Sequence, residues 1–247
     1  SVCVPTFNHA SLIHRALLSS INQTYKNIEI VVVDNASSDN TKEVVLNFTK
    51  LDSRIKYFRN ENNIGSGRNF LKCFEYASGE FVQVLGDDDW LSKNCVEISV
   101  QHILQNPDAA AILPDVVSLK FEDGEKFSFL DGWKVPGGKY SSNWFFEKIA
   151  HGEIGGVGFI SFMRKNEVLK ALKSVLLNPA HMIQRGGRTE PFDMPIFLEV
   201  LRDHDYFIVD KRIAYLKTLH GKDHVGLRGN FESLEGMVRY AILTRKS

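Results

Sequence analysis

Short apolar runs alternate with amphipathic stretches along the first half of the chain. The apolar runs are rich in β-branched and aromatic residues, which favours strands, and the amphipathic stretches repeat apolar residues at three- and four-residue spacing, which favours helices. The predicted strands are Val2–Val4, Ile28–Val33, Ile55–Phe58 and Glu80–Leu85, and the predicted helices are Ser11–Ser20, Asn40–Leu51 and Gly67–Ala77. This alternation predicts an α/β fold with a Rossmann-like mixed central sheet flanked by helices.

The pattern changes after about Pro114. Asp123-Gly124 separates two segments of alternating apolar residues and predicts a hairpin. The further predicted elements are a helix at Ser142–Ala150, a Gly-rich strand at Gly155–Met163, a polar loop at Gln184–Arg188, a helix at Met194–Arg202, a strand at Tyr206–Val209 and an amphipathic helix at Phe231–Arg245. Because no repeat, low-complexity tract or flexible linker separates the halves, we expect residues 1–115 and 116–247 to share one domain.

Composition narrows the class of protein. The 247 residues are 43% hydrophobic, which is ample for a core, and 30 basic residues balance 30 acidic ones. Without a basic block or stripe, a nucleic-acid partner has little support. The three cysteines are scattered in apolar stretches and predict reduced core residues in a cytosolic protein. No apolar run reaches the length of about 20 residues that spans a bilayer.

Polar motifs follow three of the predicted strands. They are Pro5-Thr6-Phe7-Asn8 after the first strand, Asp34-Asn35-Ala36-Ser37-Ser38-Asp39 after the second and Gly86-Asp87-Asp88-Asp89 after the fourth. Ligands of open α/β sheets bind at the carboxyl ends of the strands. The sequence therefore predicts a binding crevice at this edge of the sheet.

Three adjacent carboxylates, Asp87, Asp88 and Asp89, come directly after an apolar strand. Like charges this close repel one another and lose hydration, so they either shift their pKa values or bind a cation. Oxygen ligands favour Mg²⁺ or Mn²⁺, which uses one or two carboxylates and completes its shell with water and substrate phosphates. The alternative is a solvated acidic turn before a helix that begins near Ser92.

Four motifs in this order resemble family 2 of the inverting glycosyltransferases. They are Val4-Pro5-Thr6-Phe7-Asn8, the run from Val32 to Thr41, Asn62-Asn63-Ile64-Gly65 and the run from Leu85 to Leu91, so the resemblance is close as far as Cys95 and looser beyond. It implies a glycosyltransferase A-type (GT-A) fold and a nucleotide-diphosphate sugar as donor. The Gly-Asp-Asp-Asp form is similar to that of bacterial surface-polysaccharide enzymes.

The resemblance implies a set of donor-binding residues in the first half of the chain. Asp34 is expected to accept an N–H from the donor's base, with an Asx turn as the alternative, whereas Asp39 is expected to cap a helix. Arg68 is expected at a helix start that attracts anions, with a surface arginine as the alternative. Pro5 is expected to lie along the base, or it serves only to end its strand. The full donor-binding set is Pro5, Thr6, Asn8, Asp34, Asn63, Gly65, Arg68, Asp87 and Asp88.

One position departs from the family pattern. Family members commonly read Asp-Ser-Asp-Asp-Trp, so Gly86 stands where they have their first Asp. This departure leaves Asp87 to take the ribose and Asp88 to bind the metal. Asp89 and His220 are further metal candidates, although Asp89 can also point away or cap the next helix, and His220 can lie in a solvated loop.

The catalytic base is expected in the second half. An inverting transfer needs one carboxylate that removes the proton of the acceptor hydroxyl. By resemblance this residue is Asp193, with Glu190 as the second candidate; Asp193 is also suited to be the N-cap of the helix that follows. Arg185 and Arg188 flank two glycines, and a surface loop is favoured there over a lid that grips diphosphate.

These observations predict a metal-dependent inverting glycosyltransferase that acts in polysaccharide biosynthesis. Its cofactor would be Mn²⁺ or Mg²⁺, its donor a nucleotide-diphosphate sugar and its acceptor a glycan or lipid-linked saccharide, with residues 1–115 binding the donor and 116–247 the acceptor. We expect a cytoplasmic protein, acting at the inner face of the membrane when its acceptor is lipid-linked. The helix at Phe231–Arg245 either packs in the core or lies at that surface. The alternatives are a non-catalytic nucleotide-sugar binding module and a nucleotidyltransferase, although the first loop lacks the Gly-rich basic sequence of the latter.

Overall fold

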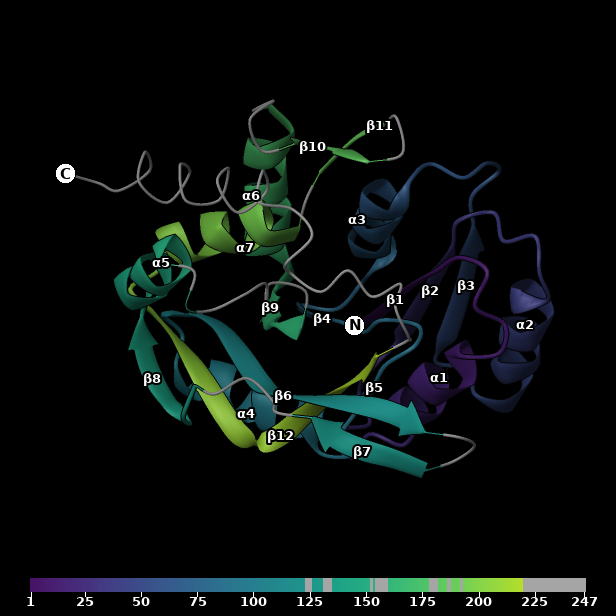
Figure 1. Cartoon of the computed structure of the whole chain (residues 1–247), viewed down its shortest axis with the longest axis horizontal. Helices are drawn as coiled ribbons and strands as arrows, with labels where there is room; N and C mark the ends of the chain where they lie inside the picture. Colours follow the sequence, from purple (N-terminus) through teal and green to yellow (C-terminus); the bar gives the residue numbers. More distant parts are fainter. Residues whose placement is uncertain are drawn as a thin grey trace.

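A mixed sheet runs through the protein (Figure 1). The computed structural model describes residues 1–122, 126–130, 135–151, 153, 160–177, 182–185, 188–191 and 193–219. The strands of this sheet are β1 (Val2–Thr6), β2 (Ile30–Asp34), β3 (Ile55–Arg59), β4 (Phe81–Val84), β5 (Trp90–Leu91), β6 (Ala109–Glu122), β7 (Lys126–Leu130), β8 (Gly138–Ser141), β9 (Phe162–Arg164) and β12 (Tyr206–Leu219). Over the described residues the order is β3-β2-β1-β4-β9-β6-β12-β5, with β7 paired to β6 and β8 to β12.

The helices confirm the layered α/β fold. They are α1 (Ile13–Ile21), α2 (Thr41–Leu51), α3 (Ser66–Tyr76), α4 (Cys95–Gln105), α5 (Ser142–Ala150), α6 (Lys165–Leu177) and α7 (Asp193–Arg202). Figure 1 shows α1 and α2 on one side of β1, β2 and β3, and α3 on the other side, where it packs against β1 and β2. All of these elements belong to a single domain.

Strands β1, β2, β3 and β4 form a parallel block in which β2 is buried along its whole length. A parallel strand covered by helices on both faces needs apolar residues at successive positions, which explains the run Ile30-Val31-Val32-Val33. The chain builds outward from β1 through β2 to β3 and then returns to place β4 on the other side of β1. The direction of winding therefore reverses between β1 and β4, and open α/β sheets form their binding crevices at such a switch point.

Several helix starts differ from their predicted positions. The N-cap of α2 is Asn40, and Asp39, one residue earlier, accepts the Thr41 N–H through Oδ1 at 3.0 Å. The helix expected near Ser92 begins instead at Cys95, because β5 intervenes. Helix α7 begins at Asp193 itself, so the prediction that Asp193 precedes this helix as its N-cap is wrong.

The second half confirms some predicted elements and corrects others. Helix α5 has the predicted bounds, and the hairpin is confirmed by the pairing of Phe121 with Phe127. Strand β12 continues to Leu219, well beyond the predicted end at Val209, and the predicted loop around Gly186 is flanked by paired strands β10 (Met182–Arg185) and β11 (Arg188–Pro191). Of the strand predicted at 155–163, residues 155–159 lie outside the described residues, and β9 contains the last two predicted residues, Phe162 and Met163. The helix predicted at 231–245 lies outside the described residues.

The core joins both halves of the chain. Strand β6 crosses the boundary expected at residue 115 and pairs with β12 in parallel, so one sheet contains segments from both sides of that boundary. The three cysteines are free thiols in this core, as predicted, and burial raises the pKa of Cys3 and of Cys95 to about 12. They are therefore packing residues without nucleophilic character.

Candidate active site

The loops after β1 and β2 are fastened to each other at the carboxyl edge of the sheet. Asn8 has a left-handed backbone conformation (φ 57), which asparagine tolerates better than most residues. Its Oδ1 accepts the Ser38 N–H at 2.7 Å, and its own N–H donates to Ser37 Oγ at 2.9 Å. Asn8 thus shapes the rim of the site, while contact of its exposed side chain with a donor stays a prediction. Pro5 lies inside β1, paired with Val33, so it does not stop the strand.

Asp34 is fully buried at the end of β2 and accepts three hydrogen bonds. Its Oδ1 receives the Ser37 N–H at 2.8 Å, which is the Asx turn considered as an alternative role. Its Oδ2 receives both the Tyr57 hydroxyl and Arg59 Nη1, each at 2.6 Å. Burial, together with the hydrogen bond to Asp34, raises the pKa of Tyr57 to about 12, so this hydroxyl remains a donor at neutral pH.

This geometry changes what Asp34 can offer to a ligand. A carboxylate has about four acceptor positions, and the three hydrogen bonds leave one, on Oδ1. Tyr57 and Arg59 come from the neighbouring strand β3, and sequence analysis missed both. The predicted contact of Asp34 with the donor's base stays a prediction. The guanidinium of Arg59, whose side chain is 34% exposed, provides an additional polar group at this position.

A network of asparagines holds the segment between β3 and α3. Asn35 Nδ2 donates to Asn63 Oδ1 at 3.0 Å, and Asn35 Oδ1 accepts from Asn60 Nδ2 at 3.1 Å. Asn63 Oδ1 also accepts the Gly65 N–H at 2.9 Å. Gly65 has φ 92 and ψ 155, a conformation open essentially to glycine alone. Asn63 and Gly65 thus have structural roles in shaping the turn before α3, and Arg68 lies exposed in the first turn of that helix.

The acidic run forms a tight turn after β4. The Asp89 N–H donates to the Gly86 carbonyl at 3.1 Å, and the Asp89 carboxylate folds back toward Gly86. A Cβ placed on Gly86 would lie 2.8 Å from Asp89 Oδ2 and 3.1 Å from Asp88 Oδ1. Glycine at this position therefore makes room for the two carboxylates, which is a physical reason for its replacing the family's Asp. Asp89 is buried and separated from α4 by β5, so it does not cap that helix.

His9 joins this turn from the loop after β1. Its Nδ1 lies 2.8 Å from Asp87 Oδ1, across 78 residues of sequence. Because a carboxylate can only accept, Nδ1 carries the proton. The hydrogen bond to Asp87 raises the pKa of His9. Sequence analysis missed His9, since nothing in its local sequence indicates a partner so far along the chain.

Two buried oxygens at the switch point have no hydrogen-bond partner in the described structure. They are Thr6 Oγ1 at the end of β1 and Asp87 Oδ2 after β4, whose residues are 3% and 7% exposed. The register pairs Thr6 with Asp34 on one side of β1, and pairs Cys3 with Val84 on the other. Buried polar atoms are usually bonded, and Gln83 Oε1 and Ser99 Oγ are also unpartnered in the part of the chain that the structure describes. Thr6 Oγ1 and Asp87 Oδ2 are the two that lie beside the crevice, where a ligand can supply the missing partners.

The residues present fit a divalent cation that takes most of its coordinating atoms from a bound substrate and water, and only a few from the protein. Among the described residues no group of three His, Cys, Asp or Glu side chains forms a complete metal site. Magnesium commonly takes only one or two carboxylates from the protein. Asp88 is half-buried next to the unpartnered Asp87 Oδ2, so this turn provides oxygens of the required kind. The third predicted ligand, His220, lies outside the described residues.

The predicted catalytic bases lie on consecutive elements. Glu190 is in β11, where it pairs with Ile183, and Asp193 is the first residue of α7. A carboxylate in the first turn of a helix is stabilised by the helix dipole. Strand β11 contacts α3, the helix that follows the Gly65 turn, so this segment approaches the donor half of the fold. The catalytic roles of Asp193 and Glu190 stay predictions.

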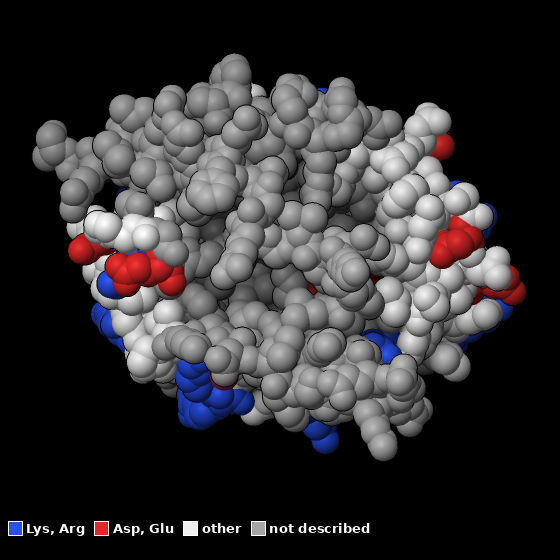
Figure 2. Space-filling view, in the orientation of Figure 1, with Lys and Arg blue, Asp and Glu red and all other residues white. Residues whose placement is uncertain are grey.

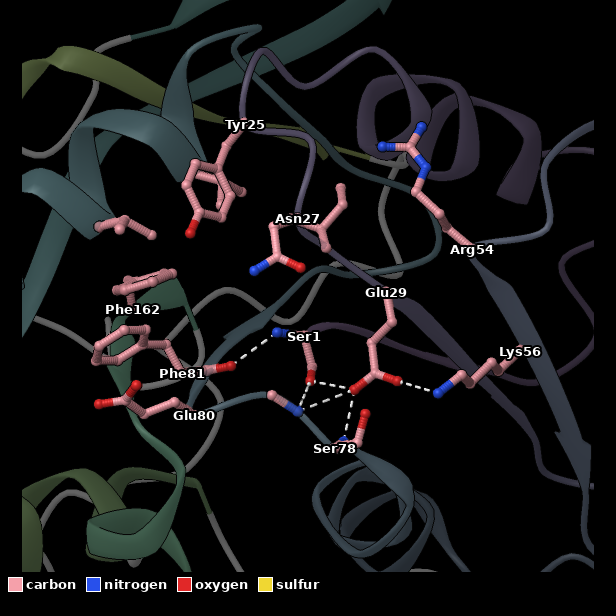
Figure 3. A pocket seen from close by; sticks show the side chains of 14 residues that line it. Ser1, Tyr25, Asn27, Glu29, Arg54, Lys56, Ser78, Glu80, Phe81 and Phe162 are labelled. Carbon is pink, nitrogen blue, oxygen red and sulfur yellow. Dashed lines mark hydrogen bonds and ion pairs between the residues drawn. The ribbon is translucent and has the colours of Figure 1, made fainter.

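A pocket of about 480 Å³ lies at the opposite edge of the sheet (Figure 3). It is lined by Ser1, by residues around the starts of β2, β3 and β4, by Val96 and Val100 of α4 and by Phe162 of β9, and none of the predicted site residues takes part. Its acidic residues are Glu29 and Glu80, and Glu29 already accepts from Lys56 Nζ at 2.6 Å and from the Ser78 N–H at 2.5 Å. This pocket is therefore separate from the candidate active site.

The surface carries both signs of charge. On the face in Figure 2, the described acidic and basic side chains form small separate patches without a continuous field of one sign. Within the parts of the chain that the structure describes, no helix has both the length and the apolar character to cross a membrane.

Comparison with known proteins connects the first two thirds of the chain with one family. A model described as "Glycosyl transferase family 2" matches residues 1–165. The GalNAc(5)-diNAcBac-PP-undecaprenol beta-1,3-glucosyltransferase of Campylobacter jejuni is 47% identical over 102 residues, which are 41% of this chain and 33% of the relative. The UDP-Glc:alpha-D-GlcNAc-diphosphoundecaprenol beta-1,3-glucosyltransferase WfgD of Escherichia coli is 38% identical over 106 residues, 43% of this chain and 41% of the relative. The alignments thus span less than half the length of these curated relatives.

The fold is also that of a solved structure. The crystal structure of S. aureus TarS 1-349 in complex with UDP-GlcNAc matches 98% of this chain and 65% of that TarS 1-349 chain, with a TM-score of 0.71 and 18% identity. At this identity the likeness shows the fold alone, and it confirms the predicted GT-A fold.

Proposed function

The chain belongs to glycosyl transferase family 2, and from this premise we propose that it transfers a sugar from a nucleotide-diphosphate donor to a hydroxyl of a glycan or lipid-linked saccharide. The observation that carries the proposal is the pair of unpartnered buried oxygens, Thr6 Oγ1 and Asp87 Oδ2, at the switch point of the sheet. A polyhydroxylated nucleotide sugar supplies the donors that these atoms lack.

The relatives support an acceptor carried on lipid in polysaccharide biosynthesis. Two of them are named as glucosyltransferases that act on undecaprenol-linked saccharides, and one is named for UDP-Glc as donor. An acceptor of this kind would place the reaction at a membrane surface. Uridine donors are therefore the first to test, and the structure of TarS with UDP-GlcNAc, although distant in sequence, supports the same choice.

In the proposed donor site, Asp87 takes a ribose hydroxyl through Oδ2, and Asp34 with Arg59 faces the base. The Gly65 turn and Arg68 stand at the N-terminus of α3, where free N–H groups favour an anionic phosphate. Asp88, with Asp89 and His220 as further predicted ligands, would hold Mg²⁺ or Mn²⁺. The bound cation would supply positive charge that stabilises the leaving nucleoside diphosphate.

The proposed reaction is a direct displacement that inverts the anomeric carbon. Asp193, or Glu190 as the second candidate, removes the proton from the acceptor hydroxyl. The acceptor oxygen then forms a bond to the anomeric carbon while the bond from that carbon to the diphosphate breaks, and the nucleoside diphosphate leaves with the bonding electron pair. An α-linked donor would give a β-linked product without a covalent enzyme intermediate.

Donor binding tests this proposal. Isothermal titration calorimetry of UDP-, GDP-, CMP- and dTDP-sugars, each with Mn²⁺ and with EDTA, is expected to show binding of one nucleotide class. Asp87→Asn and Asp88→Asn should weaken this binding about tenfold or more, since each loses an ionised acceptor for the ligand or its cation. The control is Asp203→Asn, which removes an outward-facing carboxylate paired with Lys170.

Three outcomes would count against the proposal. Absence of binding by every donor would refute the donor site, and equal weakening by Asp203→Asn would show a general loss of stability. Transfer to undecaprenol-linked saccharides is measured by mass spectrometry, and donor binding without any such transfer would favour the non-catalytic binding module. Transfer lost in Asp193→Asn but retained in Glu190→Gln would support the assigned base.

A further inference from the structure

The position of His9 is determined by its backbone as well as by its side chain. The His9 N–H donates to Thr41 Oγ1 at 3.1 Å, and the His9 carbonyl accepts from both Leu12 and Ile13 at 3.0 Å, where α1 begins. The residue is thus fixed between the starts of α1 and α2. Its ring reaches Asp87 from there, with 2.8 Å between Nδ1 and Oδ1.

The two oxygens of Asp87 have different surroundings because of this contact. Oδ1 is bonded to His9, whereas Oδ2 is buried and has no partner in the described structure. A carboxylate held at one oxygen has lost the freedom to rotate about its terminal torsion, which is otherwise broad. The other oxygen is consequently fixed in direction before a ligand arrives, and this reduces the ordering cost of binding.

We propose that His9 is a positioning residue for the donor, holding Asp87 Oδ1 so that Oδ2 is presented to a hydroxyl of the nucleotide sugar. This inference rests on the proposed function of the site. Asp88, the next carboxylate, is proposed to bind the cation. Because His9 bonds only to Asp87, the two adjacent carboxylates can take different roles, Asp87 at the nucleotide sugar and Asp88 at the cation. An ion pair that simply ties two loops together has no need of a second available oxygen, whereas this arrangement leaves Asp87 Oδ2 available to a ligand.

Three variants at position 9 test the geometry. His9→Ala removes the donor group, His9→Asn places an amide nitrogen close to the position of Nδ1, and His9→Gln places it one bond farther out. Binding of UDP, GDP, CDP and dTDP is measured by calorimetry, and the melting temperature reports stability. We expect His9→Ala and His9→Gln to weaken nucleotide binding about tenfold, whereas His9→Asn stays within about threefold of the wild type.

A double-mutant cycle makes the test specific to Asp87. If His9 acts through this carboxylate, His9→Ala should weaken binding further by less than about twofold in an Asp87→Asn background, because interacting residues are not additive. His14→Ala is the control, since it removes a half-buried histidine of α1 that lies outside the site. In steady-state assays the effect of His9→Ala should fall mainly on the KM for the donor, which a general loss of stability would not produce.

The outcomes separate failure of the inference from failure of the proposed function. If the wild type binds nucleotide and the His9 variants bind equally well, or if the effects of His9→Ala and Asp87→Asn add fully, the positioning role is wrong while the proposed function stands. If the wild type binds none of the four nucleotides, both fall together. Equal weakening by His9→Asn and His9→Gln would show that the ring itself, and not the hydrogen bond at Nδ1, is required, which also overturns the proposal.

Discussion

The substitution Asp34→Asn tests whether the buried carboxylate after β2 stabilises the fold. The side chain keeps its size but loses its charge and one of its two acceptor oxygens. Asp34 accepts from Ser37, Tyr57 and Arg59, which contribute a backbone N–H, a hydroxyl and a guanidinium. An asparagine cannot satisfy both sides, because its amide group must face either the Ser37 N–H or the pair from β3.

The structure sets the expected magnitude. If the amide nitrogen faces Ser37, two N–H donors oppose each other. If it faces β3, Arg59 Nη1 loses its carboxylate acceptor, and Arg59 keeps only the bond from Nη2 to the Ser37 carbonyl at 2.8 Å. Leaving a buried donor unsatisfied costs about 1–3 kcal/mol, and breaking a fully buried ion pair about 3–5 kcal/mol. Because the Arg59 side chain is 34% exposed and can regain water, we expect a loss of about 2–3 kcal/mol in the free energy of unfolding.

Urea denaturation at pH 7 measures this loss, with Tyr57→Phe and Asp203→Asn beside it. Tyr57→Phe removes one of the three hydrogen bonds and should cost about 1–2 kcal/mol. Asp203→Asn, at an outward-facing ion pair with Lys170, should cost less than about 0.5 kcal/mol. A cost for Asp34→Asn no larger than that of Asp203→Asn would refute the structural role and leave contact with a ligand as the reason for this residue.

Two further predictions concern acid stability and backbone conformation. Burial opposes ionisation of Asp210, but hydrogen bonds from Arg212 and His102 outweigh it and lower the pKa of Asp210 to about 2 from 3.8. A lowered pKa stabilises the fold at pH values above the pKa of the unfolded state, so the contribution of about 2 kcal/mol at pH 7 should be roughly halved by pH 3. Urea denaturation should show this as a difference in stability between the wild type and Asp210→Asn that shrinks as the pH falls. An Asp210→Asn cost that stayed constant with pH would contradict this. Gly65→Ala should destabilise the fold by about 1–3 kcal/mol because Gly65 has φ 92, whereas Gly67→Ala inside α3 should be neutral or stabilising. Equal melting temperatures for the two variants would show that the Gly65 conformation is not required.

Much of the fold could be predicted from local sequence because its parallel strands are buried on both faces. A run such as Ile30-Val31-Val32-Val33 leaves few alternatives to a central strand, and the polar motifs after β1, β2 and β4 were correctly expected at one edge of the sheet. Helix α6 was missed although its sequence carries the signal, with Val168, Ala171, Leu172 and Val175 buried at helical spacing.

Strand β12 was underestimated for a different reason. The apolar run that predicted it ends at Val209 and is followed by three charged residues, Asp210-Lys211-Arg212, which do not continue the apolar pattern. In the structure, the register with β6 shifts between Asp210 and Ala214, and Asp210 turns to His102 of α4. The strand therefore continues through an irregularity whose charged residues find partners elsewhere in the fold, Asp210 at His102 of α4 and Lys211 at Asp115 of β6. A local sequence pattern cannot show partners of this kind.

The site was predictable in its acceptors but not in the residues that orient them. Carboxylates in sequence motifs, such as Asp34 and Asp87, stand out because few chemistries place acidic groups at the end of an apolar strand. The residues that decide which oxygen of each carboxylate remains available are Tyr57, Arg59 and His9, which lie on other strands or loops and carry no local signal. These partners leave the two carboxylates in opposite conditions. Asp34 is almost fully bonded within the protein, whereas Asp87 is bonded at one oxygen and unpartnered at the other. If the site binds a nucleotide sugar, the binding energy from Asp87 should therefore exceed that from Asp34, even though sequence analysis placed both residues in the donor-binding set.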